Sequence, residues 1–422
     1  MSGRKDAKGS VNDQSGVMTG LPPTRESQVT FANYISRPYN RWAFRNMDVV
    51  THTAMMPRGG PLPVMNVSGQ AERYGDQSVS DIHGTKMPLR DLLKTYSADG
   101  FIVLKEDEIL FEQYLNGYSE HQRHIWYSMT KSLVSTAFGI LMDQYDIDLT
   151  ASPAQYVEEL KGSGFERTTI QQVLNHASAI AFKENYVDTE SDFARFYAPA
   201  INLGYVPGAR DVQPEETDIY GVYDFLARFI EAEPENIPGD SFEYNSANAD
   251  LIGWIIARVS GMSVQEFIGE HIWRHIGSNH DAAIVVDRAY MAVATGGMTS
   301  TLRDAALFGR LILNRGFVNG KQCVPKAWID ETINLNDQDR LRYAANPLYV
   351  EEAWQYYKNM WWIIDPERGE YAAVGIHGQV IYINRAANTV IAQFSSQATA
   401  SQVGSEDFRS KLSVMRQLTQ ST

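Results

Sequence analysis

The order of hydrophobic patterns along the chain is the feature that most limits how it can fold. Two runs rich in β-branched and aromatic residues, 100–104 and 109–114, flank a polar KEDE turn and predict a hairpin. Four more strand-like runs come near the other end, separated by PERG and NRAAN turns: 361–364, 371–376, 380–384 and 389–395. With helical sequence between these two sets, the pattern predicts an α+β fold in which both terminal regions complete one antiparallel sheet.

The middle of the chain, from about 150 to 290, has the pattern of helices joined by polar loops. Its clearest apolar stripe ends at Gly261, a typical helix cap, and consists of Leu251, Ile252, Ile255, Ile256 and Val259. Further helices are expected from Ser128 onward, at 302–314 and at about 405–420. We therefore expect a flexible arm over 1–30, an α/β lobe made of 31–150 and 290–422, and an inserted, mainly helical lobe over 151–289.

Composition narrows the class of protein. The 422 residues are 44% hydrophobic, enough for a large core, and the net charge of −14 argues against nucleic acid or an acidic membrane surface as a partner. No stretch reaches the ~20 apolar residues of a membrane span, and the N-terminus lacks the apolar core of a signal peptide. Cys323 is the single cysteine, so no disulfide can form within the chain. A cytoplasmic protein is the expectation.

The stretch IWYSMTKS contains Ser128 and Lys131, one helical turn apart, where an aromatic run changes into helix-forming sequence. On one helix face the two side chains can meet, and a helix N-terminus favours an alkoxide or oxyanion. A desolvated lysine can lose its proton and act as a base. The alternative is that Ser128 only caps the helix and Lys131 is solvated. Because Ser2-Gly-Arg-Lys5 has the same spacing, this motif alone leaves both interpretations open.

Two later motifs bear on this choice. FEYNSANAD places Tyr244 and Ser246 directly before the apolar stripe, and the alternative for Tyr244 is a tyrosine packed on the core. GIHGQ lies in the C-terminal strand region and carries His377, Gly378 and Gln379. A lone histidine there is most simply a hydrogen-bonded strand residue, whereas a glycine lets a substrate approach the backbone closely.

Taken in order, these motifs resemble the serine hydrolases with a β-lactamase fold, a group that includes penicillin-binding proteins, family VIII carboxylesterases and 6-aminohexanoate-dimer hydrolases. The matching stretches run from residue 40 onward: Asn40–Phe44, YSMTKS, YNSANAD, Thr295–Ser300, Met360–Trp362 and GIHGQ. The resemblance implies a β-lactamase/transpeptidase-like fold and a covalent acyl-enzyme mechanism without a cofactor or a metal. The ordered set is far more specific than any one motif.

The resemblance also implies roles for individual residues. It makes Ser128 the nucleophile, Lys131 its base partner and Tyr244 the proton shuttle. The backbone N–H groups of Ser128 and Gln379 would form the oxyanion hole. Tyr186 would donate a hydrogen bond to the leaving amide nitrogen, and the alternative for it is a surface-loop aromatic residue. The expected substrate contacts are Tyr186, Ser246, Thr295, His377 and Gly378.

Three departures from the family pattern bear on the substrate. Thr295 stands where the dimer hydrolases have asparagine, and Tyr197 falls where an acid would receive a substrate amine. Candidates to replace that acid lie nearby, at Asp188, Glu190 and Asp192. His377 replaces a permanent cation, so a β-lactam carboxylate would lose its usual partner near pH 7. This departure argues against a true β-lactamase.

Other motifs give little support to a different chemistry. His271 and His275 share a helix face but lack the acid of an H-E-x-x-H site, and the chain has no G-x-S-x-G elbow, P-loop or dinucleotide fingerprint. We therefore expect a metal-free serine hydrolase that acts on small linear amides or esters. The alternatives are a family VIII-type carboxylesterase, an acyltransferase and a non-catalytic binding or sensor protein. A homodimer in which the N-terminal arm packs on the partner stays open.

Overall fold

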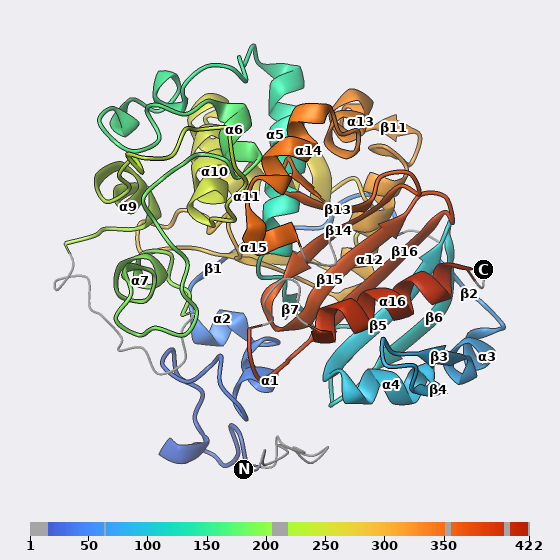
Figure 1. Cartoon of the computed structure of the whole chain (residues 1–422). Helices are drawn as coiled ribbons and strands as arrows, with labels where there is room; N and C mark the ends of the chain where they lie inside the picture. Colours follow the sequence, from blue (N-terminus) through green and yellow to red (C-terminus); the bar gives the residue numbers. More distant parts are fainter. Residues whose placement is uncertain (1–15, 63–64, 205–217, 351–355, 401–405, 421–422) are drawn as a thin grey trace, which may run out of the picture.

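An eight-stranded sheet forms the centre of the computed structural model, which describes residues 16–62, 65–204, 218–350, 356–400 and 406–420 (Figure 1). Its strand order is β12-β13-β14-β15-β16-β5-β6-β2. The C-terminal strands are β12 (Tyr356–Lys358), β13 (Trp361–Asp365), β14 (Glu370–Gly375), β15 (Gln379–Asn384) and β16 (Thr389–Ser395). The N-terminal part adds β5 (Ala98–Lys105), β6 (Glu108–Tyr114) and β2 (Asn66–Val67). Because β16 pairs antiparallel with β5, both terminal regions complete one sheet.

Helices cover both faces of this sheet. On one face lies α12 (Leu302–Leu313), whose Gly309 packs against Ile381 of β15. Successive residues of a strand point to opposite faces, and the next residue, Tyr382, contacts Thr419 of α16 (Glu406–Gln420). In Figure 1 α16 crosses this second face. The sheet is therefore buried on both sides, which explains the nearly continuous apolar sequence of β15 and β16.

Two further long helices, α5 (Met129–Gln144) and α10 (Ala247–Ser260), pack against each other beside the sheet. α5 also contacts β14. Gly261 ends α10 in the left-handed conformation, with φ 69°, as its sequence predicted. Among the described residues, no single helix has the length and apolar composition needed to cross a membrane. Only α10 and the stretch Val264–Trp273 taken together meet both criteria, and they are bent by 79° relative to each other.

The other helices are short and connect these elements. They are α1 (Asn40–Ala43), α2 (Met47–Val50), α3 (Ala71–Asp76), α4 (Leu89–Thr95), α6 (Ile170–Leu174), α7 (Ala198–Ala200), α9 (Val222–Arg228), α11 (Val264–Ile268), α13 (Lys326–Ile333), α14 (Asp337–Ala344) and α15 (Pro347–Val350). Single π-helical turns occur at Phe193–Tyr197 and Gly269–Trp273. Two small hairpins pair β3 (Ser78–Ser80) with β4 (Lys86–Pro88) and β10 (Phe317–Val318) with β11 (Lys321–Gln322).

A second sheet of four short strands fixes the start of α5. Its strands, in order, are β1 (Thr53–Met56), β8 (Ala282–Val285), β9 (Met298–Ser300) and β7 (His124–Ile125). Beyond β7, the Trp126 N–H donates to the Met298 carbonyl at 2.8 Å. The Met298 N–H donates in turn to Thr130 Oγ1, 3.1 Å away in the first turn of α5. The chain therefore enters α5 along a strand edge that is hydrogen-bonded on both sides of the turn.

The antiparallel sheet completed by both terminal regions, with its flanking helices, is confirmed. The structure adds the small sheet, whose β8 lies inside the segment 151–289 that the sequence predicts to be mainly helical. The division into two lobes stays a prediction. Of the expected flexible arm, residues 1–15 lie outside the described part, and residues 16–30 fold back, with the Met18 N–H donating to the Ser27 carbonyl at 2.7 Å.

Gly139 is a sensitive point in the packing of α5. A Cβ at Gly139 would lie 2.2 Å from the ring of Trp328 on α13, so Gly139→Ala forces the two helices apart. We expect a loss of about 1–3 kcal/mol in the free energy of unfolding, measured by urea denaturation. Gly69→Ala is the matched control, because no atom lies within 4 Å of the added carbon. An equal loss in both variants would contradict the packing argument.

Candidate active site

Ser128 lies at the junction between β7 and α5, where the chain turns sharply. Tyr127 adopts a left-handed conformation, with φ 46°, and Ser128 directly precedes the first residue of α5. The Ser128 side chain makes no capping hydrogen bond to the helix. Its Oγ instead accepts a hydrogen bond from Lys131 Nζ at 2.8 Å. The helix-cap alternative therefore does not describe this serine.

Lys131 is a buried amine, only 1% exposed. Besides the serine, its Nζ donates to the Thr295 carbonyl at 3.0 Å and lies 5.1 Å from the centroid of the Tyr244 ring. Burial lowers the pKa of Lys131 to about 8, although the nearby Glu184 and Asp250 carboxylates raise it. About one lysine in ten is then neutral at pH 7, so this amine is able to accept a proton.

Tyr244 joins this pair from the loop that precedes α10. Its side chain is hydrogen-bonded to Ser128, and burial raises the pKa of the Tyr244 phenol well above its usual value. The ring stacks on Trp362 of β13, with centroids 5.6 Å apart and planes at 15°. The Tyr244 N–H donates to the Tyr349 hydroxyl at 3.3 Å. The phenol therefore keeps its proton near neutral pH and is placed to pass it on.

His176, which the sequence motifs did not reveal, supports the Tyr244 loop. The Asn245 N–H donates to His176 Nδ1 at 3.1 Å, and Nε2 lies 3.4 Å from the Tyr357 hydroxyl. The centroids of the His176 and Tyr244 rings are 5.0 Å apart. Burial, with a contribution from the Lys131 charge, lowers the pKa of His176 well below its usual value. A neutral ring with Nδ1 as an acceptor thus fixes the backbone that carries Tyr244.

A second carboxylate acts on Lys131 through a backbone bridge. Asp250 of α10 accepts the Thr295 N–H on Oδ1 at 3.0 Å and the Tyr197 hydroxyl on Oδ2 at 2.5 Å. Burial raises the pKa of Asp250 to about 7, whereas Tyr197, Lys131 and the Thr295 N–H lower it. Thr295 is fully buried. The backbone of Thr295 therefore joins Asp250 to Lys131 beside the nucleophile, and the substrate contact expected of its side chain stays a prediction.

Tyr186 and Ser246 meet at one carboxylate, that of Glu184. The Tyr186 hydroxyl donates to Glu184 Oε2 at 2.5 Å, and the Ser246 N–H donates to Oε1. The Tyr186 ring packs on Phe193, with centroids 4.9 Å apart. Ser246 is buried at the N-terminus of α10. Glu184, which no sequence motif indicated, thus connects the Tyr186 loop to the helix that follows Tyr244.

The GIHGQ turn differs most from the expectation. β14 ends at Gly375, where a Cβ would lie 2.3 Å from the Trp126 carbonyl oxygen and 3.2 Å from the Ser128 nitrogen. A Cβ at Gly378 would instead meet Lys411 Nζ, 3.0 Å away on α16. Gly375, and not Gly378, is therefore the glycine that lets two backbones approach closely at the nucleophile.

His377 is also directed into the protein, with 1% of its surface exposed. Its Nδ1 donates to the Gln397 carbonyl at 2.8 Å, and its ring packs edge-on against Phe44 with centroids 5.0 Å apart. Burial lowers the pKa of His377 to about 4, so the ring is neutral near pH 7. The ring therefore holds this turn in place, and the substrate contact expected of His377 stays a prediction. Gln379 uses its side chain to bond the Ser395 carbonyl at 2.6 Å, and the oxyanion role of its N–H stays a prediction.

Comparison with known proteins identifies the class. Residues 89–415 match the family model described as Beta-lactamase, so the chain belongs to the Beta-lactamase family and is a serine hydrolase with that fold. The resemblance inferred from the motifs is confirmed. Over 391 residues the chain is 30% identical to 6-aminohexanoate-dimer hydrolase from Paenarthrobacter ureafaciens, and the match covers 90% of this chain and 92% of that protein.

Solved structures agree with this assignment. The chain superposes with a TM-score of 0.80 on a Bacillus anthracis protein described as "Putative 6-aminohexanoate-dimer hydrolase", at 26% identity and covering 94% of this chain and 98% of the other. A family VIII carboxylesterase superposes with a TM-score of 0.50 at 15% identity, covering 75% of this chain and 91% of the other. The second likeness shows the fold alone.

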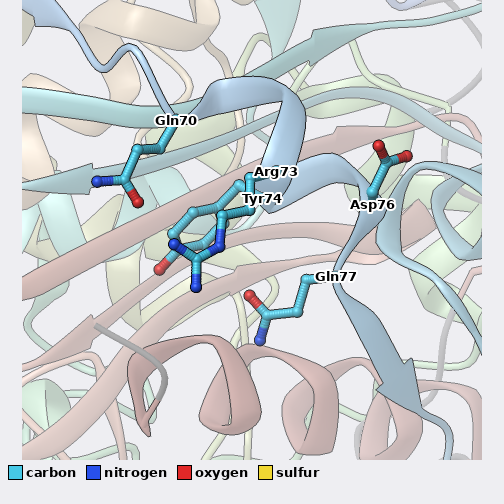
Figure 2. Close-up of a pocket in the computed structure, with 5 residues that line it drawn as sticks. All are labelled: Gln70, Arg73, Tyr74, Asp76 and Gln77. Carbon is cyan, nitrogen blue, oxygen red and sulfur yellow. The ribbon is translucent and has the colours of Figure 1, made fainter.

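A cavity of about 700 Å³ lies at α3 (Figure 2). Its lining side chains all come from α3 and its two flanking residues: Gln70, Arg73, Tyr74, Asp76 and Gln77. The Tyr74 hydroxyl donates to the Leu418 carbonyl of α16 at 3.3 Å. None of these residues approaches Ser128 in an observed contact, so this cavity is not the candidate active site. Among the described residues, no cluster of three or more His, Cys, Asp or Glu side chains has the arrangement of a metal site.

The buried lysine predicts a pH dependence. If neutral Lys131 is the base, kcat/KM rises as the pH increases through about 8 and then levels off, because deprotonation supplies the active form. Asp250→Asn removes a charge that raises the pKa of Lys131, so the rising limb should move to lower pH. The measurement is kcat/KM for one substrate from acidic to alkaline pH. Asp337→Asn, at an exposed carboxylate, is the control; an unmoved limb in Asp250→Asn would contradict the role given to Asp250.

Proposed function

We propose that this protein hydrolyses small linear amides through an acyl-enzyme formed on Ser128. The proposal is carried by the 2.8 Å contact between Ser128 Oγ and a buried Lys131 with a pKa of about 8. A lysine with its ordinary pKa of 10.5 would remain protonated near pH 7 and would not act as a base. Because the Tyr244 phenol is also hydrogen-bonded to Ser128, one hydroxyl has both a base and a proton donor beside it.

Acylation follows from these three side chains. Neutral Lys131 takes the proton of Ser128 as Oγ attacks the carbonyl carbon and a tetrahedral intermediate forms. Tyr244 gives its phenol proton to the leaving nitrogen, the C–N bond breaks, and the proton held by Lys131 restores the phenol. Water then attacks the resulting ester, Lys131 takes its proton, and Ser128 Oγ leaves protonated. The products are a carboxylic acid and an amine.

The developing oxyanion needs two donors. The Ser128 N–H, at the start of α5, is the first. The second comes from the turn after Gly375, where the sequence indicated the Gln379 N–H. Ile376 is a further candidate, because its N–H follows directly after the glycine that contacts the Ser128 backbone. Both assignments place the oxyanion between the end of β14 and the start of α5.

Two observations support a linear amide as the substrate. The 6-aminohexanoate-dimer hydrolase of Paenarthrobacter ureafaciens matches nine-tenths of the chain, and the Tyr186 hydroxyl is held at the catalytic group through Glu184. A β-lactam carboxylate is disfavoured because the buried His377 is neutral and offers it no charge. Esters are the second candidate class, since an alkoxide leaves with less help than an amine. Transfer of the acyl group to an amine or alcohol in place of water is the remaining alternative.

Ser128→Ala tests the covalent step. The variant should lose essentially all turnover and all labelling by a fluorophosphonate probe, because the probe reacts with the activated hydroxyl. Intact mass and circular dichroism measure the adduct and the fold. Ser119→Ala, at an exposed serine of the loop before β7, should keep both properties. Turnover that persists in Ser128→Ala would rule out the acyl-enzyme, and an unlabelled wild type would contradict an activated hydroxyl at Ser128.

Tyr186→Phe separates amides from esters. Removing the hydroxyl should lower kcat/KM for an anilide by about ten-fold or more while leaving a p-nitrophenyl ester of the same acid nearly unchanged, because only the amide has a leaving group that uses this contact. Steady-state kinetics on the two substrates give the comparison. Equal losses on both would argue against a specific role for Tyr186 at the leaving group.

A further inference from the structure

Glu184 accepts two hydrogen bonds, one on each carboxylate oxygen. The Tyr186 hydroxyl occupies Oε2 at 2.5 Å, and the Ser246 N–H occupies Oε1. Ser246 precedes the 14-residue helix α10, so its N–H belongs to the positive end of a helix dipole, which favours a carboxylate. The carboxylate therefore has a fixed position and a fixed role as an acceptor.

Glu184 lies close enough to the catalytic group to act on it electrostatically. The Glu184 charge raises the pKa of Lys131, and its effect is larger than the effect of the Asp250 charge. The Glu184 charge also raises the pKa of the Tyr244 phenol. The residue is half-buried and lies on the loop that carries Tyr186. A substrate bound at Ser128 is thus close to both Glu184 and the Tyr186 hydroxyl.

The contact with Glu184 determines what the Tyr186 hydroxyl offers to a substrate. A phenol has one proton and two lone pairs. With its proton donated to Glu184, Tyr186 presents only lone pairs to a third group. A secondary amide has an N–H that can donate to these lone pairs, whereas the leaving oxygen of an ester and the nitrogen of a tertiary amide have no hydrogen to give. An acceptor facing another acceptor is repulsive and leaves a polar group unpaired.

We propose that Glu184 fixes Tyr186 as a hydrogen-bond acceptor and thereby makes the site selective for secondary amides. This inference rests on the proposed function and reverses the direction of the hydrogen bond that the family resemblance implies for Tyr186. As the amide nitrogen becomes pyramidal, its N–H stays on the Tyr186 oxygen, and its lone pair is left to accept the proton of Tyr244. Glu184 is a positioning residue in this scheme, because it acts through Tyr186 and does not touch the reacting atoms.

The wild-type protein gives the first test, with three hexanoyl substrates: a p-nitroanilide, its N-methyl derivative and a p-nitrophenyl ester. Each kcat/KM is divided by the rate of hydroxide-catalysed hydrolysis, so that intrinsic reactivity cancels. The anilide should exceed its N-methyl derivative by at least about ten-fold, the effect of one hydrogen bond to a group paired with a charge. Equal normalised values for the two would overturn the proposal without any mutation.

Glu184→Gln gives the second test. A glutamine carboxamide can still accept the Ser246 N–H, but its NH₂ group donates to Tyr186 and turns the phenol proton toward the substrate. The anilide-to-ester ratio of kcat/KM should fall about ten-fold or more. Glu235→Gln, at an exposed acid to which no role in the site is assigned, should leave the ratio unchanged. In a Tyr186→Phe background, Glu184→Gln should no longer change the ratio, because the effect passes through the hydroxyl.

Two results would overturn the role of Glu184: an equal loss on anilide and ester, or a change in their ratio that persists in the Tyr186→Phe background. Thermal unfolding of each variant shows that the comparison is made between folded proteins. The proposed function fails separately, because it requires that Ser128 be labelled by a fluorophosphonate and that the wild type hydrolyse at least one of the three substrates. Labelling and hydrolysis with an unchanged ratio would leave the hydrolase intact and remove only the selectivity.

Discussion

The burial of the Lys131 amine is the constraint on which the rest of the structure depends. Burying an amine costs free energy unless its N–H groups find acceptors. Here the Ser128 hydroxyl and the Thr295 carbonyl accept hydrogen bonds from Lys131, and the Tyr244 ring packs against the amine. Keeping these groups in place requires both sheets. The small sheet leads the chain through Trp126 to Ser128, and the large sheet ends at Gly375 beside it.

Two carboxylates moderate the effect of that burial. Desolvation alone would lower the pKa of Lys131 further, and Glu184 and Asp250 counteract it, so that the value stays at about 8. A still lower pKa would give a weaker base, and a higher one would leave too little neutral amine near pH 7. The acids thus adjust the lysine between these limits, and each reaches it from a different element: Asp250 from α10, and Glu184 from the loop that carries Tyr186.

The features that depend on local sequence were predictable, and those that depend on long-range contacts were not. The start of α5, the β5–β6 hairpin and the proximity of Ser128 to Lys131 follow from neighbouring residues. His176 meets Asn245 across 69 residues, and Asp250 meets Thr295 across 45, so no local pattern reveals them. Long-range packing also decides which glycine of this segment lies at the nucleophile: Gly375, at the end of β14, packs against the backbone of Trp126 and Ser128.

The single carboxylate between the Tyr186 loop and α10 has a consequence for how such an enzyme can diversify. The groups that form and break the acyl bond come from α5 and from the loop before α10, whereas the Tyr186 group comes from a separate loop joined to α10 through Glu184. Replacement of Tyr186 in that loop can alter which leaving group is accepted while the nucleophile and its base remain as they are, whereas replacement of Glu184 also changes the pKa of Lys131. The preference for a leaving group and the strength of the base are therefore linked in this scaffold, because the carboxylate at position 184 acts on both.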